Sequence, residues 1–391
     1  MSLIWIAPLA LFGLWATVLL AFARPLIRRW REPVLKYPVL AIESDDWGAG
    51  PLAQAGLLKR LAALLAGVRD TTGHPAVMTL GVVLEVPDGA RIGADGGKRY
   101  YGLPLSDARF SGIRTALLDG VAAGVFAPQL HGLCHYWPEA VMAAAHTAPD
   151  LRAWLAAPKP ARTETLPAPL QSRWVDASVL PSRSHRAETI RQAVAGEAMH
   201  WRALFGAPPR VAVATTFIWN DRVEAAWHAA GIDTVITPGR RATCRDATGQ
   251  PGGVDRTMVT GMRSRHGLLY LVRDVYFEPA RGHGPERLLA GLEARTRQGR
   301  ACLVETHRSN FLEQPETSLA ALDTALRAAC ARCATLRFLA PEALARAIRT
   351  HDPAWIETRL GARVRAWRTR LAEIPRFARV ARLAGLGWML T

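Results

Sequence analysis

The chain has 391 residues and half of them are apolar, which excludes an intrinsically disordered protein and allows a large buried core. Its net charge of +16 comes almost entirely from arginine, because lysine occurs only at positions 36, 59, 98 and 159. No helix-turn-helix or zinc-finger pattern accompanies this charge, so we expect no nucleic-acid partner. The charge reflects either solvated arginine side chains or contact with an anionic membrane surface.

An apolar segment without charged side chains, LIWIAPLALFGLWATVLLAFA, extends from Leu3 to Ala23. It has about the ~20 residues with which a helix crosses a bilayer. A basic cluster follows this segment, within residues 24–31, rather than preceding it, which favours a transmembrane anchor over a cleaved signal peptide. By the positive-inside rule, the rest of the chain is expected on the cytoplasmic side of a bacterial inner membrane.

Short apolar runs alternate with helical patterns through the middle of the chain. Strands are expected at Val39–Ile42, Val77–Leu84, Val125–Leu130, Arg210–Trp219, Thr234–Ile236, Leu269–Phe277, Ala301–Glu305 and Leu336–Leu339. Helices are expected at Pro51–Val68, Ile113–Ala123, Trp137–Ala145, His185–Phe205, Arg222–Ala230, Pro285–Gln298, Thr317–Ala331 and Pro341–Arg349. This alternation predicts an α/β fold with a parallel sheet or barrel. Residues 85–111, 158–184 and 240–255 are expected to form loops.

The C-terminal segment predicts a basic amphipathic helix. From Trp355 to Leu371, apolar residues recur every three or four positions with arginines between them, and a second basic stretch follows at 376–382. Either this helix packs on the barrel with its arginines in solvent, or it lies among lipid headgroups and holds the barrel mouth near the bilayer. We favour the second interpretation. The expected domains are an anchor at 1–31, a barrel at 32–350 and a helical tail at 351–391.

The first expected strand, VLAI, leads directly into an acidic segment that contains Glu43, Asp45 and Asp46. Three acids at the end of a buried strand are costly to hold unless a cation meets them. One aspartate could cap a following helix, but two aspartates and a glutamate exceed that need. We therefore interpret the aspartate pair as part of a functional site.

Histidines follow two other expected strands. His131 and His135, in FAPQLHGLCHYW, are four residues apart, a spacing that on one helical turn would let both imidazoles reach one metal ion. His307 ends the expected strand in ACLVETH. Because the carboxyl ends of the strands carry the site in an α/β barrel, these histidines are expected close to the aspartates.

The acidic pair, the histidine pair and the late strand-end histidine, in this order, resemble the polysaccharide deacetylase superfamily, also known as carbohydrate esterase family 4. The segments ESDDWG, QLHGLCHYW and HRSN carry the resemblance, which covers about residues 37–345. It implies an α/β fold of the deformed (β/α) barrel type, with fewer strands than the usual eight. It also implies an enzyme that hydrolyses an N-acyl group, acetyl or formyl, from a sugar.

By this resemblance, Asp45 corresponds to the catalytic base and His307 to the general acid. Asp46, His131 and His135 correspond to the ligands of a divalent metal ion, for which zinc is expected. An enzyme of this kind that is tethered to a membrane is expected to act on a membrane- or lipid-linked saccharide, such as a polyprenyl-linked intermediate of surface-glycan synthesis. The sequence does not determine the oligomeric state.

The chain departs from the family in the third motif, which supplies an arginine that orients the base. The corresponding stretch, VAVATTFIWNDRVEAAW, lacks that arrangement, and Arg222 or Arg308 could take its place. Trp47 and Asn310 are further candidates for contacting the substrate or orienting the site. Two other functions stay open: another metal-dependent glycan hydrolase, such as a glycoside hydrolase, and a glycan-binding membrane protein without catalysis.

Overall fold

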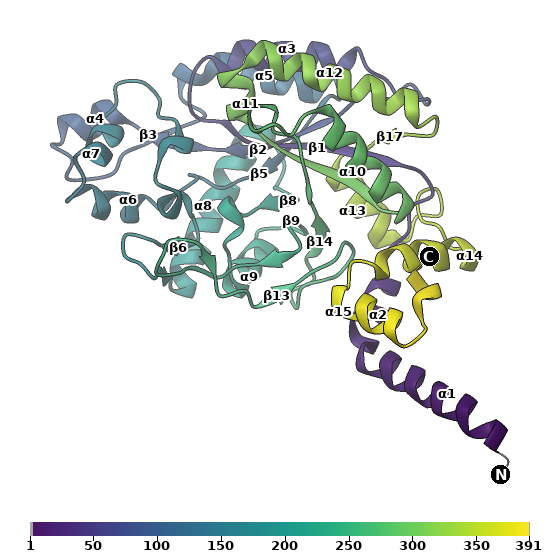
Figure 1. The fold of residues 1–391 in the computed structure, drawn as a ribbon. Helices are drawn as coiled ribbons and strands as arrows, with labels where there is room; N and C mark the ends of the chain where they lie inside the picture. Colours follow the sequence, from purple (N-terminus) through teal and green to yellow (C-terminus); the bar gives the residue numbers. More distant parts are fainter. Residues whose placement is uncertain (1–2, 391) are drawn as a thin grey trace.

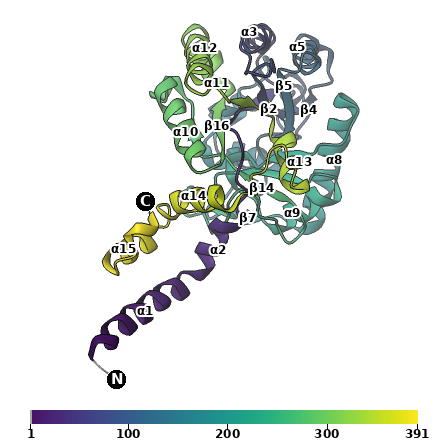
Figure 2. The ribbon, with the colours of Figure 1, turned by 90° about the vertical axis from the view of Figure 1, so that its right-hand side faces the viewer.

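The computed structural model describes residues 3–390, which form an α/β barrel with helices around its outside (Figures 1 and 2). The barrel strands are β1 (Val39–Gly48), β2 (Met78–Val83), β5 (Phe126–Leu130), β8 (Val211–Val213), β9 (Thr234–Thr237), β14 (Leu269–Val272), β15 (Val275–Tyr276), β16 (Ala301–His307) and β17 (Arg337–Phe338). Every pairing between them is parallel. β1 and β2 are buried along their whole length, as expected for strands of a parallel sheet that is covered on both faces.

The barrel closes through one short segment, residues 269–276. The strand order is β14-β9-β8-β5-β2-β1-β16-β15, and β17 pairs with β1 beside this path. Within the closing segment, β14 pairs with β9 and β15 pairs with β16, so one stretch of chain joins both edges of the sheet. That order names eight strands, but β14 and β15 belong to the same closing segment. Counted as one, they leave seven strands around the ring, with β17 outside it. The expected continuous strand Leu269–Phe277 is therefore wrong, because it breaks at Arg273 and Asp274.

Helices that cover the barrel follow most strands, as the alternating pattern predicted. They are α3 (Gln54–Ala66), α5 (Ser111–Ala122), α8 (Ala187–Phe205), α9 (Asp221–Ala229), α10 (Pro285–Arg297), α11 (Arg308–Glu313), α12 (Pro315–Arg332) and α13 (Pro341–Thr350). Apolar side chains of α3, such as Leu58, Leu61 and Leu65, are fully buried against the sheet, since three- and four-residue spacing places them on one face. The expected strand at 210–219 is shorter, because β8 ends at Val213 and a 3-10 turn follows.

The three expected loops contain short elements of their own. They are β3 (Glu85–Pro87), α4 (Gly89–Ala94), β4 (Gly102–Pro104), β6 (Val175–Asp176), β7 (Arg183–Ser184), β10 (Arg240–Arg241), β11 (Cys244–Arg245) and β12 (Pro251–Gly252), and β13 (Arg256–Thr257) follows directly after the third loop. Two further helices, α6 (Pro138–Ala145) and α7 (Pro149–Leu155), follow the strand β5. The 3-10 turns are η1 (Ala108–Phe110), η2 (Thr163–Thr165), η3 (Ala168–Gln171), η4 (Thr215–Phe217) and η5 (Pro279–Arg281).

The two ends of the chain pack together into one helical unit, here named the terminal module. Its elements are α1 (Leu3–Ala21), α2 (Ala23–Arg31), α14 (Leu360–Leu371), α15 (Pro375–Leu383) and the 3-10 turn η6 (Gly387–Leu390). The indole of Trp15 donates to the carbonyl of Ala384 at 2.7 Å, and the indole of Trp367 donates to the carbonyl of Leu26 at 3.0 Å. Apolar side chains of all these elements share one buried cluster. The expected anchor and tail are therefore in mutual contact.

The tail differs from the headgroup-bound helix that we favoured. α14 begins at Leu360 rather than at Trp355, and its Arg370 is fully buried. That guanidinium donates to three backbone carbonyls at 2.8 Å each, those of Glu32, Pro33 and Gln298. A buried arginine that satisfies backbone acceptors holds α14 on the barrel. The other interpretation, a last helix packed on the barrel, therefore describes α14.

Within the described residues, no single helix is both long enough and apolar enough to cross a membrane. The helical stretches Pro8–Ala21 and Ala23–Arg31 meet the length and composition requirement only together, and a bend of 65° separates them. The segment Leu3–Ala23, expected as one span, thus contains the whole of α1 and the first residue of α2.

The terminal module lies at the amino-terminal edge of the barrel strands. α2 precedes β1, and a bridge between Leu35 and Ile356 joins the two ends of the chain just before that strand. Asp45, near the other end of β1, is six residues beyond Val39, or about 20 Å at the usual rise per strand residue. α1 projects outward from the amino-terminal edge (Figures 1 and 2). The tail therefore does not hold the barrel mouth near lipid, since the two occupy opposite edges.

Candidate active site

Asp45 and Asp46 occupy a bulge in β1. The register between β1 and β2 shifts between Ser44 and Trp47, and Asp46 has a φ of 75°. Consecutive side chains of a regular strand point to opposite faces, whereas this bulge allows both carboxylates to face the same region. Aspartate tolerates the left-handed conformation better than most residues. Gly81 of β2 provides the space, since a Cβ there would lie 2.5 Å from Oδ1 of Asp45.

His131 and His135, after β5, both reach Asp46. Nε2 of His135 lies 3.2 Å from Oδ1 of Asp46, and Nε2 of His131 lies 3.5 Å from the same atom. The carbonyl of Val213 contacts Nδ1 of His131 at 3.1 Å, which orients the other ring nitrogen toward the aspartate. The intervening chain is not helical, and Gly132 has a φ of 105°. The expected helical turn is therefore wrong, although the two rings converge as predicted.

These three groups fit a metal ion. Within residues 3–390, Asp46, His131 and His135 form a buried group whose ligand atoms all lie within 4.8 Å of one another. Among the described residues, Oδ1 of Asp46 has no hydrogen-bond partner. Two ligands bound at ~2.1 Å in a tetrahedral arrangement are about 3.4 Å apart, close to the separations observed here. A buried, unsatisfied carboxylate oxygen between two imidazole nitrogens is an environment that a divalent cation would complete.

Arg273, which was not among the candidates from the sequence, holds Asp45. Its Nη2 and Nη1 donate to Oδ2 and Oδ1 of Asp45 at 2.6 and 3.2 Å. The same guanidinium lies 3.3 Å from a carboxylate oxygen of Glu305 and 3.6 Å from one of Glu43. Arg273 is fully buried, so these carboxylates neutralise it in a region without solvent screening. It orients the candidate base through both carboxylate oxygens.

The carboxylates around Arg273 differ in charge. Burial raises the pKa of Glu43 to about 7, because the attraction of Arg273 offsets only part of the desolvation penalty. Burial likewise raises the pKa of Glu305. For Asp45, burial acts in the same direction, but Arg273 and His131 outweigh it and the pKa lies below its ordinary value. At neutral pH, Asp45 is therefore charged while Glu43 is partly protonated.

His307 ends β16 beside Asp45, and the two residues are register partners. Its Nδ1 lies 2.5 Å from Oε1 of Glu278. Burial lowers the pKa of His307, but the hydrogen bond with Glu278 and the carboxylates of Asp46, Glu305 and Asp45 outweigh it and raise the pKa to about 9. The imidazole is therefore protonated at neutral pH. Its side chain is 32% exposed, and because Glu278 occupies Nδ1, the ring nitrogen left for a ligand is Nε2, which lies 3.8 Å from Oε1 of Glu305.

Asn310 supports this end of β16 from within α11. Its side-chain amide donates to the hydroxyl of Thr306 at 3.3 Å and to the carbonyl of His307 at 3.4 Å. It also hydrogen bonds with Glu278 and helps to keep the pKa of that carboxyl below its ordinary value. Asn310 is buried, so it orients the His307–Glu278 pair rather than contacting a substrate.

Three other candidates do not take part as expected. Trp47 is fully buried in the main apolar core, where its indole donates to the hydroxyl of Ser44 at 2.8 Å, so it supports β1 rather than contacting a substrate. Arg222 lies exposed on α9 and donates to a backbone carbonyl at 3.1 Å. Arg308 is buried and pairs with Glu164 at 2.8 Å. Neither arginine orients the base, because Arg273 occupies that position.

Both residues that the sequence analysis missed had a recognisable signal. Arg273 is a charged residue inside an apolar run that was itself expected to be a buried strand, and a buried charge requires partners. Glu278 comes two residues after β15, close to the end of its strand as His131 and His307 are to the ends of theirs. Position at a strand end thus predicted most of the site.

No family model and no curated protein sequence matches the chain. Among solved structures, a carbohydrate esterase family 4 pseudoenzyme from Bacillus anthracis matches at 11% identity and a TM-score of 0.37, over 79% of this chain and 66% of that one. A family 4 carbohydrate esterase from Streptomyces lividans, in complex with acetate, matches at 12% identity and a TM-score of 0.36, over 76% of this chain and 90% of that one. A 4-alpha-glucanotransferase from Thermococcus litoralis matches at 9% identity and a TM-score of 0.36, over 80% of this chain and 40% of that one.

Two of these three structures come from the family that the motifs resemble. An esterase, a pseudoenzyme and a transferase all match the same chain. At TM-scores of 0.36–0.37 these matches establish no reaction, so the function rests on the site residues.

Removing a ligand should remove the metal. We expect His131→Ala, His135→Ala and Asp46→Asn each to weaken metal binding by at least about tenfold, since each removes one of three protein ligands. Atomic emission measurements on the purified full chain would give the metal content, with His228→Ala on the exposed side of α9 as control. Full metal content in either histidine variant of the site would contradict the assignment.

Removing Arg273 should destabilise the barrel. In Arg273→Gln, buried carboxylates lose their cation, and we expect the free energy of unfolding to fall by about 3–5 kcal/mol. The matched variant Arg222→Gln changes an exposed arginine and should alter it by less than about 0.5 kcal/mol. Denaturant unfolding of the two variants measures the difference. Equal losses in both would show that Arg273 has no special role.

Proposed function

We propose that this protein is a metal-dependent hydrolase that removes an N-acyl group from a sugar. The proposal is carried by one arrangement at the carboxyl-terminal edge of the barrel. A group suited to a metal ion lies beside a carboxylate held by Arg273 and a protonated imidazole held by Glu278. Amide hydrolysis needs an activated water, a base that takes its proton and an acid that protonates the leaving nitrogen.

The side chains of the site divide these tasks. Asp45 is charged at neutral pH and accepts a proton from the attacking water, while His307 donates its Nε2 proton to the departing amine. The carbon–nitrogen bond breaks, the water oxygen joins the acyl carbon, and the sugar nitrogen gains a proton. A divalent ion held by Asp46, His131 and His135 would lower the pKa of the water and polarise the acyl oxygen. Because Arg273 keeps the pKa of Asp45 low, this weak base requires a water that is already acidic.

We propose zinc as the ion. Two imidazole nitrogens and one carboxylate oxygen are a common donor set of catalytic zinc, and three protein ligands leave positions for water and substrate. The two buried histidines favour zinc over magnesium or calcium, which prefer oxygen ligands.

A glycoside hydrolase is less consistent with the contacts. That reaction uses two carboxyl groups on opposite sides of the scissile bond, one of them as nucleophile or base. Asp45 is held through both oxygens by Arg273, and Glu278 is held by His307. The pairing of each carboxylate with a cation favours hydrolysis assisted by a metal ion.

We further propose that α1 anchors the protein in a bacterial inner membrane and that the substrate is a lipid-linked saccharide. The support is the uncharged sequence of α1, its exposed side chains Leu9, Phe12 and Leu20, and the arginines that follow it. A substrate in the same bilayer would be concentrated near the enzyme. Because the site lies about 20 Å from the anchored edge, the acylated sugar would be separated from the lipid by other sugars of the glycan rather than attached directly to it.

An assay of acid release tests the reaction. We expect the full chain with zinc to release acetate or formate from N-acylated glucosamine oligomers without cleaving them. Asp45→Asn should keep its metal and lower turnover by about 10². Cleavage between sugars with the acyl groups intact would favour a glycoside hydrolase, and retained metal without any turnover would favour a glycan-binding protein.

The same assay against pH tests the acid. A raised folded-state pKa means that His307 stays protonated up to pH about 9, so the rate should fall only above that value. Glu278→Gln removes the hydrogen bond that raises the pKa, and the alkaline limb should move to lower pH. Glu313→Gln, an exposed glutamate nearby in sequence, should leave the limb in place. An unchanged limb in Glu278→Gln would contradict the role of the pair.

Protease protection tests the orientation in the membrane. Because the arginines at 24–31 follow α1, we expect the barrel on the cytoplasmic side. Protease added to intact spheroplasts should then leave it uncut, while inverted vesicles should expose it. Digestion from outside would reverse the topology and move the proposed substrate to a periplasmic glycan.

A further inference from the structure

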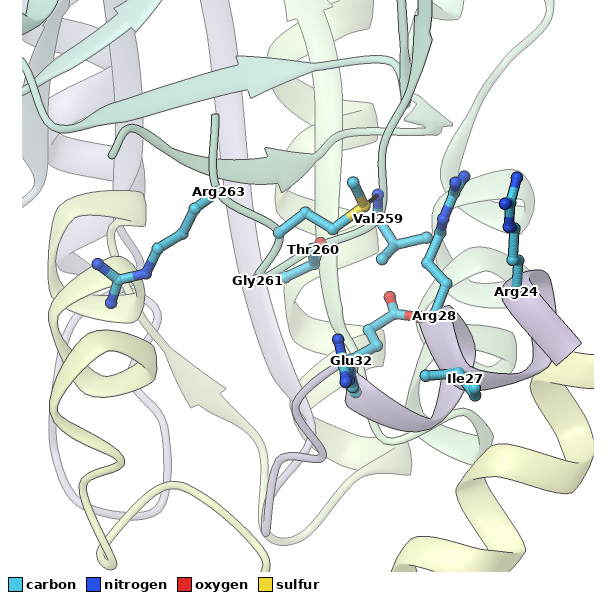
Figure 3. A pocket seen from close by; sticks show the side chains of 10 residues that line it. Arg24, Ile27, Arg28, Glu32, Val259, Thr260, Gly261 and Arg263 are labelled. Atoms are coloured by element: carbon cyan, nitrogen blue, oxygen red, sulfur yellow. Dashed lines mark hydrogen bonds between the residues drawn. The ribbon is translucent and has the colours of Figure 1, made fainter. Parts of the chain in front are cut away.

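A groove at the amino-terminal edge of the barrel combines arginine with apolar side chains. It lies between α2 and residues 259–263, and its volume is about 570 Å³. Arg24 and Arg28 reach from α2 on one side of it, and Arg263 lies on the other (Figure 3). This volume is within the range of small-ligand sites. The residues of the active site are at the opposite edge and take no part in the groove.

The positive charge of the groove is largely uncompensated. Arg24, Arg31 and Arg263 are exposed, and none has an ion-pair partner among the residues that the structure describes. Arg28 donates to the neutral hydroxyl of Thr257 at 2.8 Å. Glu32 also lines the groove, but Arg300 binds both of its carboxylate oxygens, at 2.7 and 2.8 Å. The groove therefore presents several free guanidinium groups, which suit an anion such as phosphate.

Apart from Thr260, whose hydroxyl accepts from the backbone of Val272, the rest of the lining is apolar. Ile27 is 48% exposed on α2, and Val259 and Met262 face it from the other wall. A small, fully hydrated anion would gain nothing from these side chains. A ligand that carries a phosphate next to a hydrocarbon portion would satisfy both halves of the groove.

The position of the groove indicates where such a ligand comes from. α2 follows α1 after a single residue, and α1 has no charged side chain along its length. If α1 lies in a bilayer, as proposed above, α2 stands at the level of the headgroups, where arginines meet lipid phosphates. The groove opens beside that helix.

We propose that this groove binds the phosphate headgroup of an anionic phospholipid. Arg24, Arg31 and Arg263 contact the phosphate, and Ile27, Val259 and Met262 contact the adjoining glycerol and acyl portion. This lipid joins α2 to the segment before β14 and so fixes the barrel relative to the membrane surface. The inference rests on the proposed anchor but not on the proposed reaction.

Calorimetric titration of the full chain in neutral detergent tests the site. The probe is dihexanoyl phosphatidic acid, compared with dihexanoyl phosphatidylcholine and inorganic phosphate. We expect Arg24→Gln/Arg263→Gln to bind phosphatidic acid about tenfold more weakly than the unaltered chain, because two charge-assisted contacts are lost. Both arginines are exposed and neither has an ion-pair partner among the residues that the structure describes, so folding should be unaffected.

The matched control is Arg376→Gln/Arg379→Gln, which removes the same charge from exposed positions of α15 outside the groove. Its affinity for phosphatidic acid should stay within about twofold of the unaltered chain. Equal weakening in both double variants would reduce the effect to general electrostatic attraction and overturn the proposal. Equal binding of phosphatidylcholine would also overturn it. Inorganic phosphate binding as tightly as the lipid would identify a soluble phosphate compound as the occupant instead.

Discussion

The buried guanidinium of Arg273 is the interaction on which the barrel and its site depend. It stands between β14 and β15, at the point where the ring of strands closes. From there it contacts Glu43 and Asp45 of β1 and Glu305 of β16. Burying these carboxylates without a cation would be strongly unfavourable. The closure of the barrel and the charge of the base are therefore set by one side chain.

One cation cannot compensate three carboxylates, and the structure resolves this by unequal protonation. The pKa values of Glu43 and Glu305 are raised by burial, whereas that of Asp45 is lowered because Arg273 binds both of its oxygens. Negative charge is thereby concentrated on the carboxylate nearest to the candidate metal site. The same logic applies to His307, whose partner Glu278 keeps it protonated. Asp45 and His307 are the groups proposed to transfer protons. The pKa of each is shifted by a partner, Arg273 or Glu278, that transfers none.

The barrel separates the candidate active site from the terminal module. Its carboxyl-terminal edge carries the aspartates and histidines, and its amino-terminal edge carries the terminal module and the arginine-lined groove. Parallel strands impose this separation, because all of their carboxyl ends meet at one edge. The buried contacts of Arg370 fix α14 at the other edge, so the ends of the chain are positioned independently of the site.

The sequence by itself determined the α/β class, most strands and helices, and the convergence of the aspartate pair with His131 and His135. These features follow from local patterns, namely apolar periodicity and polar residues directly after strands, which a parallel fold brings to one edge. The tertiary structure alone decided which arginine holds Asp45, because the two residues are 228 positions apart and no local pattern links them. It also decided that Trp47 is buried, that the strand at 269–277 breaks, and that α14 packs on the barrel. Each of these depends on what lies opposite a side chain once the ring closes, which spacing along the chain does not specify.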